Sequence, residues 1–218
     1  MLSTEDSHLR RFTDELVGRH GCHTVILYGS RARGDFGPES DYDLAGIRSD
    51  GAEFRIGESR DGVYLDAFVY PESAFANPES DAKHLRFIGG KILLDRDGFG
   101  ARLMDRLAAR LARGPKKLSA DELRAQFTWV RKTLARARRG DIEGDFRRVW
   151  LLHELLEFAF DARGEWYRGP KESFRHLATI DPRVHALYAE ALKPGAPFAA
   201  TETFVAHLLE NLSEPHHD

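Results

Sequence analysis

The chain contains one cysteine, Cys22, and therefore cannot form an internal disulfide. Its cysteine and histidine residues show no spacing typical of zinc ligands, and no apolar run approaches the roughly 20 residues that span a bilayer. The first residues lack the basic stretch and apolar segment of a signal peptide. These absences predict a soluble, cytoplasmic protein with no membrane partner, structural zinc or disulfide.

The chain also lacks an excess of charge of either sign. Its 32 basic and 35 acidic residues leave a formal net charge of −3 at pH 7. A dedicated nucleic-acid-binding protein is usually basic overall, so this balance argues against nucleic acid as the main partner. A length of 218 residues allows one large domain or two small ones, each with its own core.

A glycine-serine pair near the N-terminus follows an apolar, strand-like run at 24–28. Gly29 permits positive φ and a close approach of the backbone to a ligand. If a helix starts here, its free N–H groups point at phosphate oxygens. Ser30 adds a hydroxyl donor, and Arg31 and Arg33 add positive charge, so the segment predicts a cradle for a triphosphate.

Three aspartates follow this turn. Asp41 and Asp43 form an Asp-x-Asp pair at the start of a second strand-like run, and Asp66 lies inside a third, at 63–69. Residues i and i+2 of a strand point to the same face, so we expect the first two carboxylates to lie side by side. Like charges at that distance raise each other's pKa unless a cation separates them, and a hard divalent ion with oxygen ligands is the natural partner.

The order of these residues resembles the DNA polymerase β-like nucleotidyltransferase superfamily, and within it the minimal and the kanamycin nucleotidyltransferase-like enzymes. The resemblance covers the first half of the chain. It implies that Asp41, Asp43 and Asp66 bind two Mg²⁺ ions and that an NTP, most simply ATP, is the co-substrate. It also implies transfer of a nucleoside monophosphate to an acceptor hydroxyl with release of pyrophosphate.

The hydrophobic pattern changes at the segment 114–117, Gly-Pro-Lys-Lys. Before it, strand-like runs alternate with helical ones, and beyond it only helical periodicity remains. We therefore expect an α+β protein, with a small mixed-sheet nucleotidyltransferase domain at 1–114 and an all-α helical bundle at 115–218. A substrate-binding or lid role for the second domain, and a cleft between the two, are further expectations.

Local signals predict the elements within these domains. Ser3 or Thr4 is the expected cap of a first helix, and residues 57–62 are expected to form a hairpin or connector. Ser119 and Glu122 have the spacing of a capping box. The predicted strands are 23–28, 42–48, 63–70 and 91–95, and the predicted helical segments include 80–88, 145–162, 171–178, 182–192 and 200–212.

An acidic stripe runs along the helix predicted at 145–162. Kanamycin nucleotidyltransferase-like enzymes take a general base from a glutamate in their helical region, so by resemblance Glu154 or Glu157 activates the acceptor hydroxyl. No motif decides between them, and Asp66 is a third candidate. The alternative is that the stripe is the solvated edge of a mostly buried helix.

Two further features of the second half stay open. Lys171 follows an aromatic-basic loop at 166–170 and is a candidate for contact with the β- or γ-phosphate, although the loop's rings can equally pack on the bundle. Arg148 and His153 have the Arg-x4-His spacing of HEPN ribonucleases, a spacing that arises easily by chance in an arginine-rich chain.

The acceptor is not encoded in these motifs. A small molecule such as an aminoglycoside-like antibiotic fits the size and charge of the chain best. The alternatives are a nucleotidyltransferase acting on protein or RNA as a toxin–antitoxin component, and a regulatory module that binds nucleotide without turnover. Related enzymes with this architecture are often dimers, so the resemblance also makes a homodimer possible.

Overall fold

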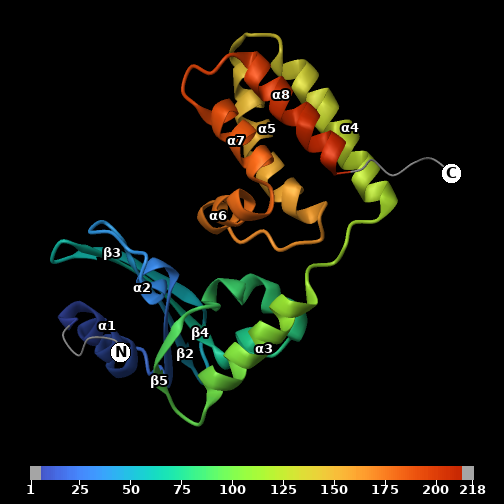
Figure 1. The fold of residues 1–218 in the computed structure, drawn as a ribbon. Coiled ribbons are helices and arrows are strands. Elements are labelled where there is room, and N and C mark those ends of the chain that lie inside the picture. Colours follow the sequence, from blue (N-terminus) through green and yellow to red (C-terminus); the bar gives the residue numbers. More distant parts are fainter. Residues whose placement is uncertain (1–5, 213–218) are drawn as a thin grey trace. The chain divides into compact units, whose positions relative to one another are not determined.

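The computed structural model of the protein describes residues 6–212, and the chain divides into two compact units (Figure 1). The first unit ends at Arg113 and the second begins at Gly114. Each unit has its own hydrophobic core, as expected for chains of about 100 residues. The units are therefore described one at a time.

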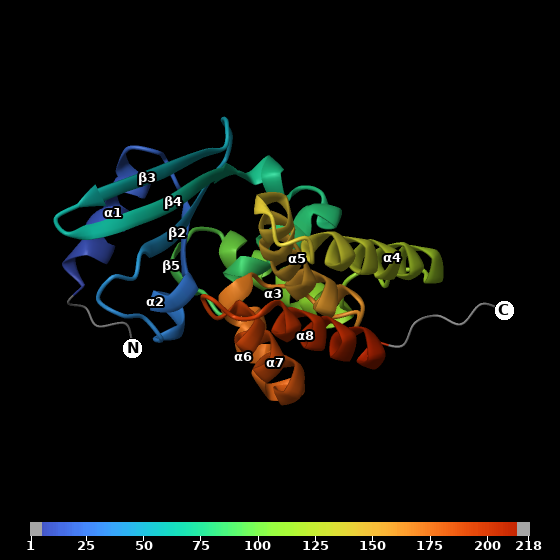
Figure 2. The same cartoon turned by 90° about the horizontal axis from the view of Figure 1, so that it is seen from above.

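A five-stranded mixed sheet forms the centre of unit 1 (Figure 2). Its strand order is β3-β4-β2-β1-β5, in which β2 and β4 are parallel and the other neighbouring pairs antiparallel. The predicted α+β class is confirmed, because all elements that come after this mixed sheet along the chain are helices. The strands are β1 (Thr24–Tyr28), β2 (Tyr42–Arg48), β3 (Phe54–Arg60), β4 (Val63–Pro71) and β5 (Lys91–Asp95).

Strand β3 was not predicted. The hairpin expected at 57–62 is confirmed, because β3 continues to Arg60, Asp61-Gly62 turns the chain, and β4 pairs antiparallel with β3. Burial alternates along β3 between exposed and half-buried residues. An edge strand pairs on one side only and tolerates glycine and charged residues that disguise it in the sequence.

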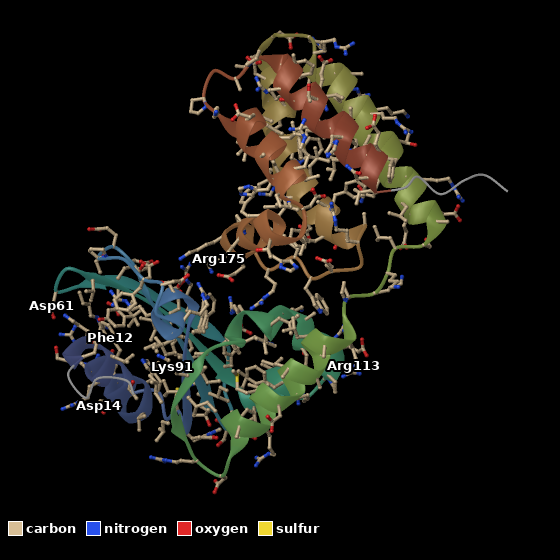
Figure 3. The ribbon with its side chains drawn as sticks, viewed as in Figure 1. Phe12, Asp14, Asp61, Lys91, Arg113 and Arg175 are labelled. Atoms are coloured by element: carbon tan, nitrogen blue, oxygen red, sulfur yellow. The ribbon has the colours of Figure 1, made fainter. Side chains whose placement is uncertain are left out.

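Helices cover both faces of this sheet (Figure 3). Helix α1 (Ser7–Gly18) packs Phe12 and Leu16 on one face. Its N-cap is Asp6, whose carboxylate accepts from the N–H of Leu9. The caps expected from the sequence, residues 3 and 4, lie outside the described residues.

The opposite face of the sheet is covered by three elements. These are η1 (Glu72–Phe75), η2 (Pro78–Phe87) and α3 (Phe99–Arg113). The helix predicted at 80–88 is a 3₁₀ segment rather than an α-helix. It buries His84, which lies 4.6 Å from the centre of the Phe75 ring, and it buries Asp81 in an ion pair with Arg106 at 2.8 Å.

Unit 2 is entirely helical. Ser119 and Glu122 form the predicted capping box at the start of its first helix, and the buried core gathers residues from every helix of the unit. Across residues 6–212, no helix is long and apolar enough to cross a membrane. The helices are α4 (Ala120–Ala137), α5 (Ile142–Asp161), α6 (Pro170–Ile180), α7 (Pro182–Leu192) and α8 (Phe198–Asn211).

Candidate active site

Two of the predicted aspartates are direct neighbours in the sheet. Asp43 on β2 is paired with Asp66 on β4 in the parallel register, and these strands lie side by side in Figures 1 and 2. Both carboxylates point to the face covered by η1, η2 and α3, because the residues two positions further along each strand belong to that core. Asp41 is exposed and lies just before β2.

The glycine-serine turn approaches the same carboxylate. Gly29 has φ +70°, and a Cβ atom built on it would lie 2.0 Å from Oδ2 of Asp43. Only a residue without a side chain fits there. The turn opens a short helix, α2 (Gly29–Arg33), that ends at Gly34 in the left-handed conformation, so the predicted phosphate cradle and the Asp-x-Asp segment are in contact.

The electrostatics of Asp43 reflect this crowding. Burial is the main cause that raises the pKa of Asp43 to about 6, and the charges of Asp66 and Asp41 raise it further. Arg33 and Arg86 partly offset the rise. Clustered carboxylate oxygens that destabilise one another are a donor set that suits a hard divalent cation.

Arg55 neutralises the third aspartate in this structure. Its Nε and Nη2 atoms donate to Oδ1 and Oδ2 of Asp66 at 2.7 and 3.0 Å, and the aspartate side chain is 18% exposed. Within residues 6–212, no three His, Cys, Asp or Glu side chains are already arranged as a metal-ligand set. A divalent ion at Asp66 would therefore compete with Arg55 for this carboxylate.

The arginines predicted to bind phosphate have other contacts. The guanidinium of Arg31 donates to the backbone oxygens of Ser40 and Asp41 at 2.8–3.1 Å and lies 3.8 Å from the centre of the Tyr42 ring. It ties the loop that carries Asp41 to α2. Arg33 lies 3.4 Å from the carboxylate of Asp35.

Arg86 is a cation beside the site that the sequence did not reveal. Its guanidinium lies 4.5 Å from the centre of the Phe68 ring and 5.7 Å from that of Tyr28, and it donates to the hydroxyl of Tyr70. Its position on η2 depends on how that segment packs on the sheet. The only signal in the sequence was a basic residue among apolar neighbours, which is too common to single out.

The predicted residues of unit 2 occupy different environments. Glu154 is half-buried and Glu157 exposed, and both line a groove of about 710 Å³ between α4 and α5. Lys171 is exposed in the first turn of α6. None of these three belongs to unit 1, which holds the aspartates.

The Arg-x4-His pair is not brought together. Arg148 donates to Thr201 Oγ1 at 2.9 Å and to the carbonyl of Ala196 at 2.8 Å, and so joins α5 to the start of α8. His153 is exposed and lies 3.3 Å from the neighbouring Glu154 carboxylate. A five-residue separation turns two side chains about 140° apart on an α-helix. The arrangement therefore offers no support for a shared ribonuclease site.

Comparison with known proteins gives a family match for part of the first unit. Residues 9–83 match the family model of the nucleotidyltransferase domain. This segment is similar to nucleotidyltransferase domains. It contains the Gly29 turn and all three aspartates, and the predicted resemblance is thereby confirmed at the level of this domain. Such domains generally use an NTP and a divalent metal ion.

The match to this family model ends before Arg86 and unit 2, which lie outside the matched residues. A solved structure of a nucleotidyltransferase-like protein from Exiguobacterium sibiricum 255-15 is similar to the chain, with a TM-score of 0.48 and 13% sequence identity. That likeness covers 93% of this chain and 75% of the other. No curated protein shows a significant match to the chain.

Proposed function

We propose that the protein is a Mg²⁺-dependent nucleotidyltransferase that moves a nucleoside monophosphate, most simply AMP from ATP, to an acceptor hydroxyl. One observation carries the proposal. The parallel register sets Asp43 beside Asp66, and Gly29 packs against the Asp43 carboxylate without a side chain between them. The turn that we propose as the phosphate site thus lies against one carboxylate of a pair that suits divalent ions.

The residues of unit 1 divide the work of this reaction. Asp41, Asp43 and Asp66 are the proposed ligands of two Mg²⁺ ions, which when bound would supply charge stabilisation for the transferring phosphoryl group. The Gly29-Ser30 turn would hold the triphosphate through backbone N–H groups and the serine hydroxyl.

Arginine side chains would complete the positive surroundings of the triphosphate. The charges of Arg33 and Arg86 already lower the pKa of Asp43, and we propose that both side chains face the triphosphate. Arg31 instead orients the Asp41 loop through its backbone contacts. Positioning and electrostatics supply most of the rate enhancement in such reactions.

The acceptor we propose is a small molecule, such as an aminoglycoside-like antibiotic, because the chain has a net charge of −3 rather than a basic surplus. Glu154 and Glu157 remain the candidate general bases, with Asp66 as the alternative, and Lys171 remains a candidate phosphate ligand. A homodimer in the cytoplasm is the proposed setting.

The experiment that tests the reaction uses α-labelled ATP and Mg²⁺ with the full chain in a lysate. Transfer predicts a labelled product, and its nature, whether small molecule, protein or RNA, identifies the acceptor class. Asp43→Asn should lower the yield by at least about 100-fold, since it removes a metal ligand. Asp14→Asn, an exposed change on α1 labelled in Figure 3, is the matched control.

Two results would contradict the proposal. The first is full labelling by the Asp43→Asn variant at saturating Mg²⁺. The second is ATP-dependent thermal stabilisation without any labelled product from several lysates, which would favour a module that binds nucleotide without turnover.

A further inference from the structure

A groove in unit 2 has a lining that a general base alone, the role proposed for Glu154 or Glu157, does not explain. It lies between the first part of α4 and the last part of α5 and has a volume of about 710 Å³, a size typical of small-molecule sites. Tryptophan rings and carboxylates make up much of its lining. We propose that this groove binds a small organic ammonium cation.

The wall formed by α5 carries three carboxylates. Trp150, Glu154, Glu157 and Asp161 all line the groove, and their spacing of four, three and four residues places them on one face of the helix. Three carboxylates therefore follow one tryptophan along about three turns of α5. A ligand lying along this wall would meet an aromatic ring at one end and negative charge along the rest.

The wall formed by α4 adds a second aromatic ring. Trp129 lines the groove opposite Trp150, and their ring centres are 5.3 Å apart at an interplanar angle of 80°. Such an edge-to-face pair is a stable arrangement, and Trp150 is still 39% exposed. Tryptophan is the side chain with the strongest attraction for an ammonium or methylated ammonium group.

The negative charge of the groove is only partly balanced by the protein. Glu122 has Lys116 at 3.8 Å and Glu154 has His153 at 3.3 Å. Among the described residues, no lysine or arginine lines the groove.

The two carboxylates nearest the end of α5 are the least balanced. Within residues 6–212, no ion pair joins Glu157 or Asp161 to a basic side chain. Burial raises the pKa of Asp161, and the charge of Glu157 raises it further. A bound cation would relieve this repulsion while its apolar part contacts the tryptophans. The site would thus select an organic ammonium ion over a neutral or anionic molecule.

The binding test uses the tryptophans as reporters and needs neither nucleotide nor metal. The chain has three tryptophans, so in Trp166→Phe the fluorescence comes from Trp129 and Trp150 alone. This full-length variant is titrated with choline and, in parallel, with 3,3-dimethylbutan-1-ol, which has the same shape without the charge. We expect saturable quenching by choline and an affinity at least about tenfold weaker for the neutral alcohol.

Variants assign the binding to the groove. Calorimetric titration should show choline affinity at least about tenfold lower in the double variant Glu154→Gln/Glu157→Gln and about fivefold lower in Trp150→Leu. Asp145→Asn is the matched control, since it removes one exposed charge from the side of α5 turned away from the groove. Its affinity should stay within about twofold of the parent value.

Three results would overturn the proposal. They are no saturable change with choline up to about 10 mM, equal affinity for the neutral alcohol, and a loss in Asp145→Asn as large as in the double glutamine variant. Circular dichroism of each variant checks that the helices of unit 2 are intact. Failure here would leave the proposed nucleotidyl transfer untouched, because that reaction is assayed through Asp43.

Discussion

Replacing Asp43 by asparagine should stabilise the protein while it removes the activity. Burial and the neighbouring carboxylates raise the pKa of Asp43 from 3.8 to about 6. The folded state therefore binds this proton more tightly than the unfolded state does. Above pH 6 the ionised carboxylate lowers the free energy of unfolding, and below about pH 4 this penalty is absent.

The size of the effect follows from the shift in pKa. A pKa that is about two units higher in the folded than in the unfolded protein means that ionisation of the carboxyl lowers the free energy of unfolding by about 3 kcal/mol. Asparagine has nearly the same shape without the charge, so Asp43→Asn should raise the free energy of unfolding by about 1–3 kcal/mol at pH 8. For a unit of about 100 residues, each kcal/mol raises Tm by about 4 °C or more.

Calorimetric melting of the metal-free protein at several pH values is the assay. The gain in Asp43→Asn should shrink as the pH falls from 7 to 4, because the native carboxyl becomes protonated over that range. Added Mg²⁺ should stabilise the parent protein by about 1.4 kcal/mol at ten times its Kd and should leave the variant almost unchanged. Asp14→Asn should behave like the parent throughout.

Two outcomes would refute this reasoning. If Asp43→Asn melts at or below the parent temperature at pH 8, the carboxylates are not mutually destabilising in solution. If the gain is the same at pH 4 and pH 8, its origin is packing rather than charge. A variant that still responds to Mg²⁺ as the parent does would separate Asp43 from the proposed metal site.

Three other predictions use the same protein. Gly29→Ala should lower the free energy of unfolding, measured in urea, by about 1–3 kcal/mol more than the control Gly62→Ala does. Both glycines have positive φ, but only at Gly29 does a new Cβ atom meet the Asp43 carboxylate. Equal losses in the two variants would contradict this clash. Arg55→Gln should raise Mn²⁺ affinity about fivefold by calorimetry, because it removes the cation that holds Asp66; unchanged affinity would show that Arg55 does not compete. Burial lowers the pKa of His84 to about 4. The free energy of unfolding should therefore fall by up to about 3 kcal/mol as the pH drops from 6.5 toward 4, because protonation of this buried imidazole favours the unfolded state. In His84→Leu the free energy of unfolding should depend less on pH over this range than in the parent protein.

Part of the fold was readable from local sequence patterns. Short apolar, strand-like runs predicted β1, β2, β4 and β5, and helical periodicity predicted the long helices of unit 2. These patterns depend on neighbours within a few residues, which the sequence displays directly. Strand β3 escaped because it is a half-exposed edge strand whose stability comes from pairing with β4.

The sequence by itself named Gly29, Asp41, Asp43 and Asp66 as candidate site residues of unit 1, from the Gly-Ser turn, the Asp-x-Asp pair and a strand-like run. Only the tertiary structure decided their surroundings. The register of β2 against β4 sets Asp66 beside Asp43, and pairing of β3 with β4 brings Arg55 to Asp66.

The same holds for Arg86 and for the groove between α4 and α5. The charge of Arg86 acts on Asp43 because η2 packs on the sheet. The groove exists because two helices far longer than their connecting loop pack side by side. Contacts of this kind join residues distant in sequence. Their geometry is set by packing and cross-strand hydrogen bonding rather than by local preference.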